Sequence, residues 1–235
     1  MATDDLDRRI ARISALAEPV RRALYRYVVG QREPASREQA AAAVGVAHHV
    51  AKFNLDKLEE EGLLEAEFSR PAGRSGPGAG RPAKRYRRAG SEVQVSLPDR
   101  RYDLAGQLMA GAIATATRSA VPISEALSAV AREKGRALGT AARSALGGGR
   151  TGVAKSLRDV EDVLDGQGYE PRTVGKRIEL ANCPFHNLAQ QHTDLVCGMN
   201  LDLVTGVLEG LGADRLRATL DPAPGMCCVA IAGGA

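Results

Sequence analysis

The sequence predicts an α+β protein of two domains, and three observations support this prediction. The chain has 235 residues, which is more than one domain usually contains. Short helical patterns and one hairpin pattern fill its first part, whereas longer helical patterns and several strand patterns fill the rest. Hydrophobic residues make up 44% of the chain and charged residues 26%, as in ordinary globular domains. We place one domain at residues 1–92 and the other, which has a small antiparallel sheet, at residues 93–235.

The N-terminal domain is predicted to contain two helices joined by a tight turn. Ser36 and Gln39 have the spacing of a capping box, so a short helix should cover residues 37–44 and end at the following glycine. A longer helix is predicted over residues 47–61. This arrangement is typical of a helix-turn-helix motif, whose second helix lies in the major groove of DNA. The outer face of that second helix carries His48, His49, Lys52 and Phe53.

A β-hairpin is predicted directly after these helices. Residues 63–69 alternate in strand fashion, and a second strand-like segment at residues 85–89 follows a tip rich in glycine and proline. Residues 70–88 contain seven basic side chains and no acidic one. A hairpin with this charge can lie along the phosphate backbone or enter the minor groove, so residues 1–92 are interpreted as a winged helix-turn-helix domain. Its candidate DNA-binding residues in the hairpin are Arg74, Arg81, Lys84 and Arg85.

The C-terminal domain is predicted to combine four helices with short strands. A strand-like Val93–Val95 segment precedes it. Helical spacing of apolar residues covers 104–113, 123–138, 153–164 and 197–211. Strand patterns cover 174–180, 216–220 and 227–231, the last two joined by a turn at 221–225.

All four cysteines lie in this C-terminal domain, together with a histidine at Cys-x-x-His spacing. Thiolates and imidazoles are preferred ligands of zinc and of iron–sulfur clusters, so the sequence predicts a metal site. Its candidate ligands are Cys183, His186, Cys197, Cys227 and Cys228. On a strand, Cys227 and Cys228 would point to opposite faces, so we expect only one of them, Cys228, to be a ligand unless a bulge intervenes. The alternative is that the cysteines are simply small buried apolar residues.

Four segments of the N-terminal domain, residues 17–22, 47–58, 60–64 and 80–86, resemble ArsR-like winged-helix repressors. The end of the hairpin and the cysteine-bearing C-terminal domain are most similar to the SufR-type regulators that sense iron–sulfur clusters. The resemblance implies a transcriptional regulator, expected to be a repressor, whose operator binding is controlled by the Cys/His site. It also implies a homodimer on double-stranded DNA, which agrees with the small surface that one short helix and one hairpin can contact.

The identity of the metal stays open at this stage. The resemblance favours an iron–sulfur cluster, but the adjacent cysteines at the end of the chain depart from the spaced pair of that family. Three cysteines with His186 fit tetrahedral zinc equally well. A further alternative is a regulator that senses an apolar small molecule in the C-terminal helices, with a structural zinc at the Cys/His site.

Other classes of protein are disfavoured. Aromatic residues are only 3% of the chain, which argues against the stacking surfaces of single-strand or RNA binders. An enzyme would have only Cys183 and His186 as nucleophile and base, with no accompanying oxyanion or cofactor loop, so we expect no catalytic activity. The chain has no apolar run of membrane-spanning length, and its acidic, polar start is unlike a signal peptide. We therefore expect no membrane partner and a cytoplasmic location.

Overall fold

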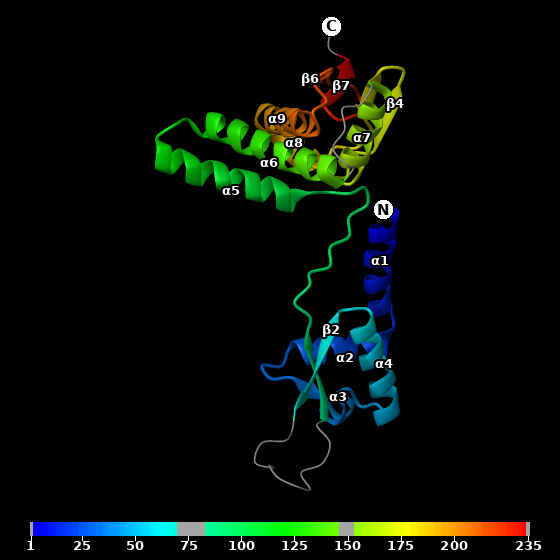
Figure 1. Ribbon diagram of the computed structural model, residues 1–235. Helices are drawn as coiled ribbons and strands as arrows, with labels where there is room; N and C mark the ends of the chain where they lie inside the picture. Colours follow the sequence, from blue (N-terminus) through cyan, green and yellow to red (C-terminus); the bar gives the residue numbers. More distant parts are fainter. Residues whose placement is uncertain (1, 70–82, 146–152, 234–235) are drawn as a thin grey trace. The chain divides into compact units, whose positions relative to one another are not determined.

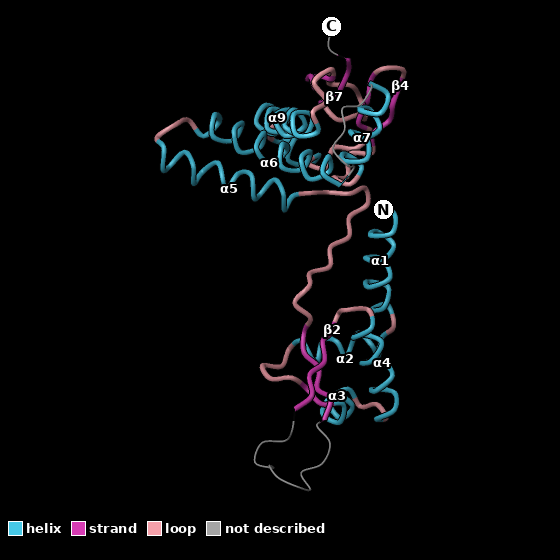
Figure 2. Tube along the Cα trace, viewed as in Figure 1, coloured by secondary structure: helices cyan, strands magenta, loops and turns pink. Residues whose placement is uncertain are grey.

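The computed structural model describes residues 2–69, 83–145 and 153–233, which fold into two compact units (Figures 1 and 2). The units are Met1–Val95 and Ser96–Ala235. Each unit has a hydrophobic core of its own, formed by residues between 15 and 86 in the first and between 104 and 231 in the second. Both units combine helices with antiparallel strands, which confirms the predicted α+β class.

The first unit packs short helices against a three-stranded antiparallel sheet of order β1-β3-β2. Ser36 caps α3 in the predicted capping box, and Gly45 ends that helix with a left-handed φ of 73°. The α4 helix follows, and the hairpin of β2 and β3 comes next, with its tip at residues 70–82 outside the described residues. The elements are α1 (Ala2–Ser14), the 3-10 turn η1 (Ala15–Ala17), α2 (Pro19–Val29), β1 (Ala35–Ser36), α3 (Arg37–Val44), α4 (His48–Glu60), β2 (Leu64–Ser69) and β3 (Ala83–Arg88).

The core of the first unit fixes the orientation of α4. Leu55 and Leu58 of α4 are fully buried, as are Leu24 of α2 and the ring of Tyr86 from β3. Burial of one such side chain contributes roughly 1.5–3 kcal/mol. One face of α4 is therefore held against the core, and the opposite face is left in solvent.

The second unit places helices beside a four-stranded antiparallel sheet of order β4-β5-β7-β6. In Figure 1 the α5 helix runs along α6, and α9 lies against the other side of α6. The elements are α5 (Tyr102–Ser119), α6 (Ile123–Ala145), α7 (Val153–Asp165), β4 (Pro171–Val174), β5 (Arg177–Leu180), α8 (His186–Gln191), α9 (Thr193–Leu211), β6 (Leu216–Leu220) and β7 (Val229–Gly233).

The α6 and α9 helices approach so closely that glycine is required where they cross. Gly135 and Gly139 of α6 face the backbone of α9, and Gly206 and Gly210 of α9 face the backbone of α6. A Cβ atom built on any of the four would lie only 2.0–2.3 Å from a carbonyl oxygen of the other helix. The contact is therefore between backbones, and no side-chain rotation can make room for a methyl group.

Three local predictions are wrong. Residues 93–95 form no strand. Residues 174–180 are not one strand, because Gly175 adopts a positive φ of 65° and the chain turns there, so that β4 and β5 form a hairpin. Cys227 and Cys228 precede β7 instead of lying on it, so the alternation of a strand does not govern where they point.

No helix in the described part of the chain combines the length and the apolar character needed to cross a membrane.

Candidate functional site

The outer face of α4 exposes the four side chains that the sequence singles out. His48, His49, Lys52 and Phe53 are all exposed, and the Phe53 side chain is 66% accessible. An accessible phenylalanine beside basic and imidazole groups gives the helix both polar and apolar contacts for a ligand. The α4 face therefore presents a continuous surface that the core of its own unit does not use.

His48 links this helix to the one before it. Its Nε2 lies 3.1 Å from Oε1 of Glu38 in α3, and both side chains are largely exposed. Hydrogen bonds lower the pKa of Glu38, the first from its own backbone N–H. Because the pair is in solvent, it contributes little to stability, and His48 stays accessible to another partner.

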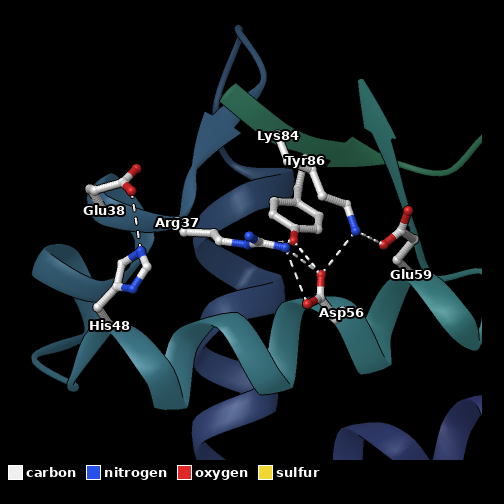
Figure 3. A network of polar contacts seen from close by, with 7 residues as sticks. All are labelled: Arg37, Glu38, His48, Asp56, Glu59, Lys84 and Tyr86. Atoms are coloured by element: carbon white, nitrogen blue, oxygen red, sulfur yellow. Dashed lines mark hydrogen bonds and ion pairs between the residues drawn. The ribbon is translucent and has the colours of Figure 1, made fainter. Parts of the chain in front are cut away.

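A buried and half-buried polar network joins α3, α4 and the hairpin, with Asp56 at its centre (Figure 3). Arg37 Nη2 donates to both carboxylate oxygens of Asp56, at 2.8 and 3.1 Å. The Tyr86 hydroxyl donates to the same carboxylate at 2.6 Å, and Lys84 Nζ donates at 2.9 Å. Lys84 also pairs with Glu59, one turn along α4. Tyr86 and Lys84 of β3 are thus hydrogen bonded to α4, and Asp56 links them to Arg37 at the start of α3.

The electrostatics of this network keep Asp56 and Lys84 charged. Burial alone would raise the pKa of Asp56, but hydrogen bonds from Tyr86, Lys84 and Arg37 lower it to about 2. Burial alone would lower the pKa of Lys84, but hydrogen bonds with Glu59 and Asp56 raise it to about 12. Arg37 also lies 5.7 Å from the Tyr86 ring centroid, within cation–π range. The angle between α4 and the hairpin is therefore fixed by charge pairs that persist through the neutral range of pH.

The candidate DNA-binding residues of the hairpin divide into two groups. Arg74 and Arg81 lie outside the described residues. Lys84 is engaged with Asp56 and Glu59, and its side chain is only 19% exposed. Arg85 donates to the carbonyl oxygen of Pro34 at 3.1 Å. The positive charges at 84 and 85 therefore serve contacts inside their own unit.

Sequence reasoning missed Arg37, Asp56 and Tyr86. Their separations in the sequence, from 19 to 49 residues, leave no local pattern. An available signal is the acidic side chain of Asp56, because a helix that faces DNA does not need a carboxylate for contacts with phosphates.

The four cysteines come together at one end of the sheet of the second unit. Because β5 and β7 are antiparallel neighbours, the residues after β5 lie beside the residues before β7. Cys183 follows β5 by three residues, and Cys227 and Cys228 come directly before β7. The N–H of Cys227 donates to the carbonyl oxygen of Leu180 at 2.8 Å, which fixes this approach. Cys197, from α9, completes the group, which we call the cysteine cluster.

The thiols of the cysteine cluster affect one another directly. Hydrogen bonding with Cys227 and burial raise the pKa of Cys183. Hydrogen bonds from Cys183 and Cys228 lower the pKa of Cys227. Hydrogen bonding with Cys227 also raises the pKa of Cys228, and Cys197 contributes to the same shift. Of these three thiols, Cys227 is therefore the one whose thiolate form is favoured, because it accepts hydrogen bonds from its neighbours.

The described structure differs from the expected ligand set in two ways. His186 is exposed at the start of α8. Cys227 and Cys228 both interact with other cysteines, Cys227 with Cys183 and Cys228 with Cys197. Among the described residues, no three His, Cys, Asp or Glu side chains already stand in the geometry of a metal-holding group. The thiols are neighbours, and their sulfur atoms do not yet converge on one point.

Two buried polar residues accompany the cluster, and no sequence pattern predicts either of them. Asn200 of α9 is 0% exposed, and its Nδ2 donates to Sγ of Cys227 at 3.2 Å. The hydroxyl of Tyr169, itself 1% exposed, donates to Oδ1 of Asn200. Burial raises the pKa of Tyr169 well above its usual range, so this hydroxyl stays a donor.

Comparison with known proteins identifies the first unit. Residues 16–67 match the helix-turn-helix domain family, and this range runs from η1 through α4 into β2. No curated protein and no solved structure matches the chain. The match covers the capped α3, the turn at Gly45 and the exposed face of α4. Residues 16–67 are therefore a helix-turn-helix domain, which supports a DNA-binding regulator of transcription.

Proposed function

We propose that the chain is a cytoplasmic transcriptional repressor of the ArsR-like type that binds double-stranded DNA as a homodimer. The observation that carries this proposal is the helix-turn-helix match together with the exposed face of α4. The second helix of such a motif places its solvent face in the major groove. Here that face carries His48, His49, Lys52 and Phe53, none of which its own unit buries. We propose no catalytic role.

The hairpin contributes to DNA binding mainly through its position. Lys84 holds β3 on α4 through Asp56 and Glu59, so it sets the direction of the hairpin relative to the DNA-facing helix. Lys52 is exposed, and it takes part in none of the ion pairs described above. A Lys52→Ala variant should therefore lose operator affinity while keeping its stability, whereas Lys84→Ala should lose both.

Two measurements test this assignment. Fluorescence anisotropy at two salt concentrations gives the operator affinity, and thermal unfolding gives the stability of the same variants. A single phosphate or base contact removed at Lys52 should cost about 1–3 kcal/mol of binding free energy. The matched control is Arg26→Ala, which removes an exposed basic side chain of α2 and leaves the α4 face intact, so it should keep the wild-type affinity. Equal affinity in the Lys52→Ala variant and the wild type would contradict the proposed DNA face.

The α5 helix offers the surface for the homodimer. Its charged residues, Asp103 and Arg118, stand at its two ends. One face packs against α6, while Ile113 on the other face is 55% exposed. Exposed small residues, Ala110 and Ala114, flank Ile113 along the same face. An antiparallel pairing of two copies would bury this stripe and bring opposite charges together at each end. An Ile113→Glu variant should therefore sediment as a monomer.

The cysteine cluster is proposed as the sensing site. Its donor set fits an iron–sulfur cluster, because four neighbouring thiols lie in a largely buried place at a loop end of the sheet. Cys183, Cys197, Cys227 and Cys228 would be the residues that hold the group. A bound cluster would supply a redox-sensitive link between the β5 end, the β7 start and α9. His186 would take part only in the alternative, a structural zinc site, and then only if its exposed ring turned inward.

Metal analysis of anaerobically purified protein separates these possibilities. Visible absorption with iron and sulfide indicates a cluster, and colourless protein with one zinc indicates a structural site. Each cysteine changed to serine should lower the metal content if all four are ligands, whereas His186→Ala should leave it unchanged. Loss of metal in His186→Ala but not in Cys228→Ser would instead support zinc bound by three cysteines and the histidine. Absence of iron and zinc from the wild type would refute the sensing role.

A further inference from the structure

We infer that Asn200, held in place by Tyr169, is a positioning residue that fixes the sulfur of Cys227 for metal binding. This inference rests on the proposed sensing function of the cysteine cluster. It concerns residues that touch no metal themselves. It also predicts that Cys227, which the strand argument had left out of the ligand shell, is the cysteine on which the site most depends.

The α9 helix supplies two of the side chains involved. Cys197 and Asn200 are three residues apart in this helix, so they lie on the same face. That face meets the residues before β7, where Asn200 Nδ2 donates to Cys227 Sγ at 3.2 Å. One helix face therefore supplies both a sulfur of the cluster and a hydrogen-bond donor to another sulfur of the cluster.

The orientation of the Asn200 amide is fixed by its partners. Because the Tyr169 hydroxyl donates to Oδ1 of Asn200, the amide cannot flip without losing that bond, and its N–H group must face the sulfur. Tyr169 is fixed in turn by an edge-to-face contact with Phe185, with ring centroids 6.5 Å apart. Phe185 is fully buried and lies two residues after Cys183. The Tyr169–Asn200 pair thus connects the loop of Cys183 with the loop of Cys227.

The buried position of Asn200 has an energetic cost. A buried amide costs free energy unless it is hydrogen bonded, and an apolar residue of similar size would avoid that cost. Asn200 is 0% exposed among Val196, Leu203 and Val204. An amide at this place would therefore cost free energy if its role were only to fill space. An N–H group directed at a sulfur ligand orients that ligand, and outer-shell contacts of this kind typically change metal affinity by roughly 10- to 100-fold.

Cobalt binding by the full, metal-free chain under anaerobic conditions tests the inference. Co²⁺ is titrated against a competing chelator, and the thiolate-to-cobalt absorption band reports sulfur ligation. Asn200→Leu, which removes the donor at similar size, should weaken Co²⁺ binding by roughly 10- to 100-fold. Tyr169→Phe, which removes one oxygen atom, should weaken it in the same direction by a smaller factor and should preserve the fold.

The control variant separates positioning from loss of stability. Leu208→Ala removes a buried side chain of the same helix that makes no polar contact, so it should lower the unfolding temperature and keep the cobalt affinity. Wild-type affinity in both Asn200→Leu and Tyr169→Phe would overturn the inference, as would an equal loss of affinity in Leu208→Ala. If the wild-type chain bound no Co²⁺ and carried no iron or zinc, the sensing function itself would fail.

Discussion

The crossing of α6 and α9 gives the sharpest quantitative prediction, because it depends on a single missing atom. A Cβ atom at residue 206 would lie 2.0 Å from the carbonyl oxygen of Arg132 and 2.9 Å from the backbone nitrogen of Arg136. Real Cβ atoms do not come so close to backbone, and neither neighbour can rotate away. The Gly206→Ala variant must therefore push the two helices apart.

The magnitude follows from two opposing effects. Overpacking in a close-packed core typically costs about 1–3 kcal/mol, and a clash with rigid backbone belongs at the upper end. Replacing glycine by alanine inside a helix returns about 1 kcal/mol. The net loss should be about 2 kcal/mol in the free energy of unfolding. In a unit of this size that corresponds to a fall of roughly 5–8 °C in the unfolding temperature.

Gly198 provides the matched control in the same helix. A Cβ atom built on Gly198 meets no atom within 4 Å, so only the gain in helix propensity should act. Gly198→Ala should therefore be about 0.5–1 kcal/mol more stable than the wild type. Urea unfolding followed by circular dichroism measures both variants. A Gly206→Ala protein as stable as Gly198→Ala would refute the close approach of the two helices.

Two further predictions concern the first unit. Ser36→Ala removes the side chain that accepts from Gln39 N–H and should cost about 1 kcal/mol, measured by urea unfolding; an unchanged midpoint would show that the cap is not needed. Since the pKa of Asp56 is about 2 in the folded chain and ordinarily 3.8, its contribution is complete above pH 4 and is lost as the pH falls toward 2. Unfolding temperatures measured from pH 6 to pH 2 should therefore fall less steeply in Asp56→Asn than in the wild type, and parallel curves would contradict this.

The helix-turn-helix could be predicted from the sequence because its signals are local. The capping box at Ser36 and Gln39 and the glycine at 45 fix the ends of α3 within one turn of chain. The polar network around Asp56 could not be predicted in the same way. Its partners come from three elements that only the folded core brings together, and the sequence shows no pairing signal among them.

The cysteine cluster was half predictable. Concentration of all four cysteines after residue 180 indicates shared chemistry, and the structure does bring them together. Cys227 and Cys228 were expected to point to opposite faces of a strand. This expectation does not apply, because β7 begins directly after Cys228. A difference of two residues in where a strand begins is enough to remove the alternation on which the argument depended.

The glycine crossing also bears on how the cysteine cluster could act at a distance. Gly135 and Gly139 lie against the backbone of α9, and Gly206 and Gly210 lie against the backbone of α6, so backbone atoms of one helix oppose a shift of the other. Cys197 lies on α9 before this crossing, and α5 packs along α6 on its other side. We therefore expect a displacement of α9 at the cluster to be passed on to α6, and with it to the exposed face of α5 on which the proposed homodimer depends. In a looser helix pair, side-chain rotations would absorb the same displacement before it reached α5.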